Sequence, residues 1–229
     1  MRILVIQHDP DKGLGILEDP LRATGAELDV RFAGTDPVSL DGHDALIALP
    51  GIANPPDPTE AVAVTRASLA GALEGGVPVL GICLGAELLA EAAGARSFAC
   101  RAEYGYHPVT LTEEGSADAL LNGLPAIFEA FQAHGYAAEL PDGAVALARS
   151  AHALQAFRIK DRAWGLQFHP EPTEHMINTW LDTIGDAWER QGVRLKEVSA
   201  QAGRDVPAWL PLAAGIAQRF VRIARSVRQ

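Results

Sequence analysis

In the N-terminal half of the chain, short continuous apolar runs alternate with longer stretches whose apolar residues recur at helical spacing. Such runs are typical of strands buried on both faces of a sheet. Their alternation with helices predicts βαβ units and a mostly parallel sheet. Strands are expected at residues 3–7, 27–32, 45–49 and 77–82, and helices at residues 14–24, 57–74 and 84–93.

Capping signals place the ends of two of these helices. Asp57 is expected to cap the helix 57–74, with Pro58 at its first position and Glu60 as the capping-box glutamate. Gly75-Gly76 ends that helix, and Gly94 ends the helix 84–93.

Beyond about residue 107 the pattern changes to short strands separated by turn residues, which predicts an antiparallel extension of the sheet. Its strands are expected at residues 107–112, 127–133, 144–148, 155–159 and 163–168. An amphipathic helix is expected at 174–190 and a last one at 207–229. We expect the last helix to dock on the sheet with its arginines in water; a membrane-surface or dimer-interface role is the less favoured alternative. The arginines are Arg219, Arg222, Arg225 and Arg228.

Length limits the number of domains. A chain of 229 residues can bury one sizeable core but is short for two. We expect a single domain over residues 1–229, with a C-terminal helical extension from about residue 191.

Composition and charge exclude several classes of function. A hydrophobic content of 48% is ordinary for a globular protein, and a formal charge of −10 opposes nucleic acids and anionic membranes. No signal peptide or membrane-spanning stretch is recognisable, so a cytoplasmic location is expected. The two cysteines lie in no metal-binding spacing, and we expect neither a metal nor a cofactor.

Cys83 lies in Gly81-Ile82-Cys83-Leu84-Gly85, between a predicted buried strand and a predicted helix. This context is typical of a nucleophile elbow, in which glycines permit the sharp turn and the close packing around it. The helix N-terminus favours the thiolate, and the backbone N–H of Leu84 can stabilise an oxyanion. The alternative is that Cys83 is a small buried hydrophobe, the role assigned here to Cys100.

His169 and Glu171 end a predicted strand in the sequence Gly165 to Glu171. Residues two apart in an extended chain point to the same side, so the carboxylate can contact the imidazole. A cysteine that attacks an amide needs a base and later an acid, and histidine serves as both near neutral pH. The alternative is a strand-end histidine beside a solvated glutamate.

Together, GICLGAE at 81–87 and GLQFHPE at 165–171 resemble the class I glutamine amidotransferase family, as a stand-alone chain similar to the GMP synthase-type amidotransferase domain. The resemblance covers residues 1–187. It implies a flavodoxin-like α/β fold, an open, mostly parallel sheet with helices on both faces, and a triad of Cys83, His169 and Glu171.

The resemblance also implies substrate-binding positions. Gly51 lies where the family completes its oxyanion hole, and Gly135 and Tyr136 follow His134 where backbone groups contact the substrate; His134 alone fits a turn equally well. Glu87 replaces the glutamine that is usual in glutamine-using members. It lies one helical turn after Cys83, where it either selects another γ-glutamyl compound or only complements the helix dipole.

Three functions remain open from the sequence. The first is release of ammonia from glutamine through a thioester, with a separate synthase chain as the acceptor. The second is a γ-glutamyl peptidase or hydrolase without an acceptor, because that group has a similar G-x-C-x-G-x-E. The third is a catalytically silent binding protein on the same fold. A small γ-glutamyl substrate is expected in the first two, and a homodimer remains open.

Overall fold

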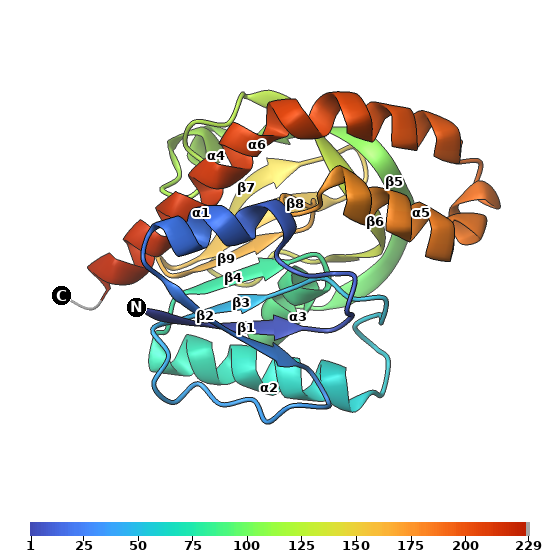
Figure 1. Cartoon of the computed structure of the whole chain (residues 1–229). Coiled ribbons are helices and arrows are strands. Elements are labelled where there is room, and N and C mark those ends of the chain that lie inside the picture. The colour runs from blue at the N-terminus through green and yellow to red at the C-terminus, as the bar shows by residue number, and fades with distance from the viewer. Residues whose placement is uncertain (228–229) are drawn as a thin grey trace.

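The computed structural model describes residues 1–227, and in that range nine strands form one mixed sheet (Figure 1). Their order across the sheet is β2-β1-β3-β4-β9-β8-β7-β5-β6. In chain order the strands are β1 (Arg2–Gln7), β2 (Glu27–Phe32), β3 (Ala45–Ala48), β4 (Val79–Ile82), β5 (Ser97–Leu111), β6 (Ile127–Ala138), β7 (Val145–Arg149), β8 (Leu154–Ile159) and β9 (Ala163–Leu166).

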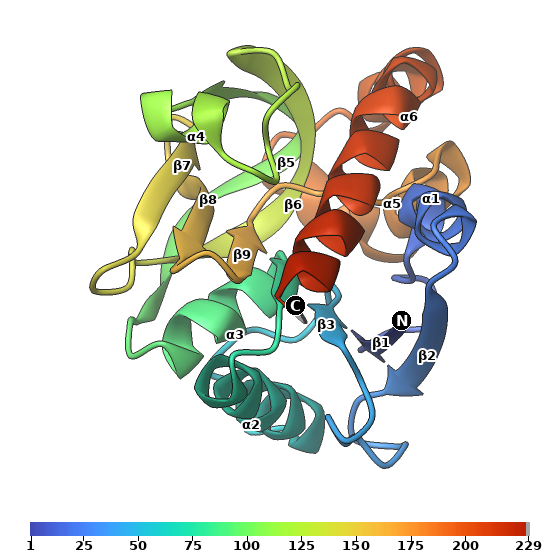
Figure 2. The same ribbon diagram turned by 90° about the vertical axis from the view of Figure 1, so that its left-hand side faces the viewer.

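Helices cover both faces of this sheet. Figure 2 shows α2 and α3 on one face, and α1 and α6 on the other. The helical elements are the 3-10 turn η1 (Gly15–Leu17), α1 (Glu18–Ala23), α2 (Glu60–Gly75), α3 (Leu84–Ala92), α4 (Glu113–Ala117), α5 (Glu174–Glu189) and α6 (Leu195–Ser226).

The predicted fold class is confirmed by the strand pairing. Strands β2, β1, β3, β4 and β9 pair in parallel, and their order is that of a flavodoxin-like sheet with β9 as its fifth strand. The antiparallel extension consists of β8, β7, β5 and β6. Strand β9, predicted as part of that extension, is instead the junction, because it runs parallel to β4 and antiparallel to β8.

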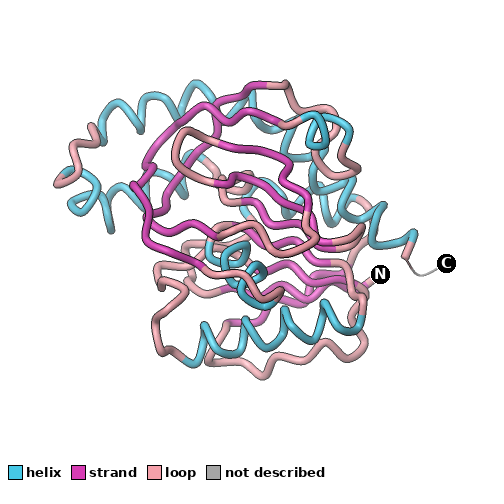
Figure 3. Tube along the Cα trace, turned by 180° about the vertical axis from the view of Figure 1, so that it is seen from behind, coloured by secondary structure: helices cyan, strands magenta, loops and turns pink. Residues whose placement is uncertain are grey.

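Strands β5 and β6 are longer than predicted. The sequence indicated only 107–112 and 127–133, whereas the strands span Ser97–Leu111 and Ile127–Ala138 and form a long curved hairpin (Figure 3). The missed half of β5 is only partly buried, contains Gly105 at φ +86° and has a register shift between Ala99 and Glu103. Because bulges and exposed edges break the alternation of polar and apolar residues, this half resembles a loop in sequence.

Two helix starts also differ from the prediction. Helix α6 begins at Leu195 rather than Pro207, and Pro207 and Pro211 lie inside it. Each proline removes one backbone hydrogen bond of the helix. Buried Val198 and Ala202 nevertheless continue the apolar stripe on the N-terminal side of both prolines. At α2 the cap is Thr59, whose side chain accepts a hydrogen bond from Val62 N, and not Asp57.

Helix α6 packs into the core. Its residues Ile216 and Phe220 belong to the same apolar cluster as Val5, Ile47 and Leu80 of the central strands. The arginines of α6 were predicted to lie in water, but two of them donate hydrogen bonds to backbone carbonyls. Arg219 donates to Leu120 O and Arg225 to Thr24 O. Arg222 is exposed, and Arg228 and the predicted end of the helix at Gln229 lie outside the described residues.

Within residues 1–227, no helix has the length and apolar character needed to cross a membrane.

Candidate active site

Cys83 lies at the sharp turn between β4 and α3. Its backbone has φ +51° and ψ −112°, a conformation that non-glycine residues seldom adopt and that recurs at functional sites. A Cβ atom on Gly85 would collide with Ala48 O, and one on Gly81 would collide with Gly85 O. The two glycines therefore allow the close packing that the sequence predicted around the cysteine.

His169 and Glu171 form a buried pair beyond the end of β9. The Nδ1 of His169 lies 2.7 Å from Oε1 of Glu171, and both residues are at most 3% exposed. The backbone fixes both residues, because His169 N donates to Phe131 O and Ile16 N donates to Glu171 O. Within residues 1–227 the other ring nitrogen, Nε2, has no hydrogen-bond partner, so it is the ring atom left to exchange a proton.

The elbow and the histidine meet in one cavity of about 290 Å³. Glu171 is the one predicted site residue that does not line it, since it lies behind the His169 ring. The predicted residues that do line it are Gly51, Cys83, Leu84, Glu87, Gly135, Tyr136 and His169. Cys100, predicted to have only a packing role, is partly exposed and is absent from the lining.

Burial and two carboxylates disfavour the thiolate of Cys83. Burial raises the pKa of Cys83 well above its usual value, and the charges of Glu87 and Glu171 raise it further. A hydrogen bond from the backbone of Leu84 and the charge of Lys12 lower the pKa. Because burial and the two carboxylates outweigh the effects that lower the pKa, Cys83 needs a base to lose its proton. His169 lines the same cavity and is the candidate for that base.

Glu87 is buried in the cavity at 3% exposure. Burial raises its pKa to about 7, against a hydrogen bond from Gln167 and the charge of His134, which lower it. The Nε2 of Gln167 donates to Oε1 of Glu87 at 3.0 Å and lies 3.8 Å from Cys83 Sγ. Sequence reasoning missed Gln167, although the same two-residue alternation that paired His169 with Glu171 places it on their side.

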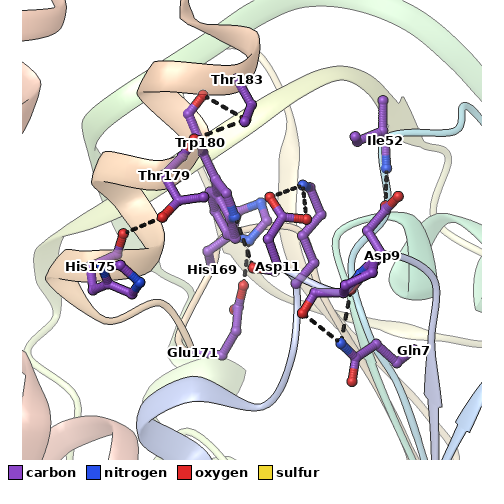
Figure 4. A network of polar contacts seen from close by, with 12 residues as sticks. Gln7, Asp9, Asp11, Ile52, His169, Glu171, His175, Thr179, Trp180 and Thr183 are labelled. Carbon is purple, nitrogen blue, oxygen red and sulfur yellow. Dashed lines mark hydrogen bonds and ion pairs between the residues drawn. The ribbon is translucent and has the colours of Figure 1, made fainter.

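The loop after β1 holds the Gly51 segment in place, as Figure 4 shows. Oδ2 of Asp9 accepts a hydrogen bond from Ile52 N at 2.8 Å, and Gln7 donates to Asp9 O at 2.8 Å. On the other side, Trp180 Nε1 donates to Asp11 O at 3.1 Å. The loop thus links β1, the Gly51 turn and α5 around the cavity.

Lys12, in the same loop, brings a buried cation to the cavity. Its Nζ lies 2.9 Å from Asp11 Oδ2 and 5.3 Å from the centre of the Trp180 ring. Sequence reasoning missed this residue, because a lysine five positions after a strand carries no motif.

His134 also lines this cavity. Its Nδ1 lies 2.8 Å from Tyr136 O and its Nε2 lies 3.3 Å from Glu103 Oε2. Burial lowers its pKa, but hydrogen bonds with Cys100 and Glu103 outweigh burial and raise the value to about 9. His134 is therefore a buried imidazolium that fixes the backbone of Tyr136, which is a larger role than a turn histidine has.

Among residues 1–227, no group of three or more His, Cys, Asp and Glu side chains is arranged to hold a metal ion.

Sequence comparisons relate the chain to known proteins. The family model described as Glutamine amidotransferase class-I matches residues 16–179. The GMP synthase [glutamine-hydrolyzing] of Thermomicrobium roseum is 38% identical over 146 residues, which are 58% of this chain and 27% of the relative. The aminodeoxychorismate synthase of Streptomyces griseus is 34% identical over 178 residues, 75% of this chain and 24% of the relative. The chain thus spans about a quarter of the length of these relatives.

Solved structures share the fold. A glutamine amidotransferase from Thermotoga maritima superposes with a TM-score of 0.86 at 24% identity, covering 96% of this chain and 98% of that one. A glutamine amido transferase from Methylobacillus flagellatus gives a TM-score of 0.87 at 22% identity, covering 97% and 94%.

Proposed function

Because the chain belongs to the class-I glutamine amidotransferase family, we propose that it hydrolyses the side-chain amide of glutamine and releases ammonia. One observation carries the proposal: the elbow Cys83 and the hydrogen-bonded His169 line a single cavity, with the second nitrogen of the ring free. These are the nucleophile and the base that amide cleavage requires.

The proposed reaction proceeds in two halves. His169 Nε2 takes the proton of Cys83, and Sγ attacks the amide carbon to form a tetrahedral intermediate. The backbone N–H of Leu84 stabilises its oxyanion, with the Gly51 to Ile52 turn as the second side of the hole. Collapse breaks the C–N bond while His169 returns the proton to the departing ammonia.

The second half regenerates the thiol. Water loses a proton to His169 and attacks the thioester. The C–S bond then breaks while His169 gives that proton to Sγ, which releases glutamate and restores the Cys83 thiol. Glu171 keeps Nδ1 protonated and stabilises the imidazolium that forms in both halves.

The acceptor of the ammonia is proposed to lie on another chain. The relatives are named as synthases, and the match covers about a quarter of their length. A separate synthase chain is therefore the partner that an ammonia-transferring function calls for.

A γ-glutamyl peptidase or hydrolase is the second candidate, and one observation favours it. Glu87 lines the cavity one turn after Cys83, at the position where glutamine-using members usually have glutamine and where γ-glutamyl hydrolases have a similar glutamate. Such an enzyme needs no acceptor chain.

The deciding experiment compares glutamine with γ-glutamyl dipeptides, with ammonia and free amino acids measured separately. Ammonia from glutamine supports the first function, and amino-acid release from dipeptides supports the second. Cys83→Ala is expected to abolish either activity, whereas Cys100→Ala keeps it. Labelling of Cys100 rather than Cys83 by an electrophilic glutamine analogue, or silence on all substrates, contradicts the proposal.

A further inference from the structure

A second cavity, of about 250 Å³, lies on another side of His169. It is enclosed by the first half of α6, by β5 and β6, and by the segment that follows His169. His169 lines both cavities, but none of the other residues around this one lines the cavity of Cys83. The proposed hydrolysis of glutamine makes no use of it.

Aromatic rings form much of its wall. Trp209 stacks on Phe128 with ring centres 5.7 Å apart, and Tyr106 meets Phe131 edge-on at 5.4 Å. The indole is fixed in place, because Trp209 Nε1 donates to Pro170 O at 3.1 Å. A wall of held aromatic rings offers π faces to a cation without further ordering.

The charges at this cavity are all negative among the described residues that line it. Glu129 and Asp205 line it, and no lysine or arginine does. Burial and then the charges of Asp205 and Glu174 raise the pKa of Tyr106, which indicates negative potential at the ring. The chain as a whole has a formal charge of −10, so nothing in its overall charge opposes a cationic ligand.

We propose that this cavity is a second ligand site, which binds an organic ammonium ion carrying an aromatic or apolar group. The apolar part fills the space between Trp209 and Tyr106, and the ammonium faces the rings and the carboxylate of Asp205. A neutral molecule of the same shape gains only the apolar part of this interaction, because the cation–π and carboxylate contributions need the charge.

The test uses benzylammonium as the probe and benzyl alcohol as its neutral counterpart, each titrated calorimetrically into the full chain. Benzylammonium is expected to bind about tenfold more tightly than the alcohol. A Glu129→Gln, Asp205→Asn double variant should lose most of that difference while its affinity for the alcohol is unchanged. Asparagine retains an oxygen that can accept the hydrogen bond which Gln201 donates to Asp205, so the fold is expected to survive.

Two further variants locate the ligand. Asp142→Asn, which removes an exposed carboxylate elsewhere, should bind as the wild type does. Ligand binding beside Trp209 should also change the tryptophan fluorescence of the chain, and Trp209→Phe should remove most of that change. No binding of benzylammonium, or equal binding of the alcohol, overturns the proposal. Loss of binding in Glu87→Gln with retention in the double variant also overturns it, because the ligand would then lie in the cavity of Cys83.

Discussion

Glu87 is the residue whose environment has the largest measurable consequences. It is a carboxyl group with a pKa of about 7 that lies beside a thiol, held by Gln167 and facing the imidazolium of His134. Its protonation therefore bears on the free energy of folding as well as on the reactivity of Cys83.

Glu87→Gln should stabilise the protein at neutral and alkaline pH. The folded-state pKa of about 7 lies above the ordinary 4.5, so the folded protein binds more protons than the unfolded chain between these values. Protonation of Glu87 therefore contributes to the free energy of unfolding; this contribution is fully present below pH 4.5 and is lost as pH rises through 7. Glutamine does not ionise, so the variant keeps the free energy of unfolding that the wild type loses above pH 7, on the order of 3 kcal/mol. Urea unfolding at pH 5 and pH 8 measures it, and equal differences at both values contradict the assignment.

The same substitution should activate Cys83 and change substrate choice. Because the charge of Glu87 raises the pKa of Cys83, its removal should shift alkylation by iodoacetamide to lower pH. Because glutamine is the usual residue at this position in glutamine-using members, preference should move from γ-glutamyl peptides toward glutamine. A Cys100→Ala background confines the alkylation to Cys83. If neither the alkylation profile nor the preference moves, Glu87 has no part in the site.

His169→Ala should damage turnover more than Glu171→Gln. The first removes the proton carrier, whereas the second leaves a polar group 2.7 Å from Nδ1 but loses the charge that stabilises the imidazolium. The losses in kcat are expected to be about 10⁴-fold or more and about 10²-fold. Circular dichroism checks that both variants are folded. A Glu171→Gln enzyme with wild-type kinetics shows that the carboxylate is dispensable.

The site was partly accessible from sequence because its central residues lie in contiguous motifs. Cys83 is marked by its flanking glycines, and His169 and Glu171 by strand alternation. Lys12 reaches the cavity, and Asp9 holds Ile52 at its edge, only because their loop folds against Trp180 and Ile52, which are far away in the chain. Contacts of that kind depend on tertiary structure and leave no local pattern.

At the scale of elements, short buried strands were predicted closely and long exposed ones were not. Strand β3, which is buried throughout, was predicted at 45–49 and spans Ala45–Ala48. The curved half of β5 and the start of α6 depend on packing between the β5–β6 hairpin, α5 and α6, for which Val198 and Trp188 supply the contacts. Local sequence does not encode that packing.

Thr59→Ala should destabilise the protein through α2 alone. Loss of the hydrogen bond to Val62 N leaves a helix N-terminus uncapped, at a cost of about 1 kcal/mol. Thermal unfolding measures the loss, and turnover should be unchanged because α2 contributes nothing to the cavity. Ser68→Ala on the same helix, which removes no cap, is the matched control. If the two variants are equally stable, Thr59 does not cap the helix and the predicted cap, Asp57, is the better assignment.

For the molecule as a whole, we propose that residues 1–229 form a single folding unit that includes the helical extension from about residue 191. The burial of Ile216 and Phe220 against β1, β3 and β4 supports this. Tryptophan fluorescence and far-ultraviolet circular dichroism should then report one coincident transition in urea. Two separated transitions contradict a single unit.

Removing residues 195–229 should prevent folding rather than trim a tail. The truncation uncovers the apolar face of the sheet that α6 covers, so the product should bind a hydrophobic dye and lack near-ultraviolet dichroism. A soluble truncated protein with native dichroism contradicts this expectation.

The pairing of α6 with the beginning of the chain also has a consequence for synthesis on the ribosome. Arg225 donates a hydrogen bond to the carbonyl of Thr24, so a helix made after the central strands completes the layer over an element made before most of them. Until residues 213–224 emerge, the nascent chain exposes the strand surface that Ile216 and Phe220 later cover. Chaperone binding to stalled nascent chains should therefore persist throughout translation of the central strands and fall sharply only when α6 has left the exit tunnel.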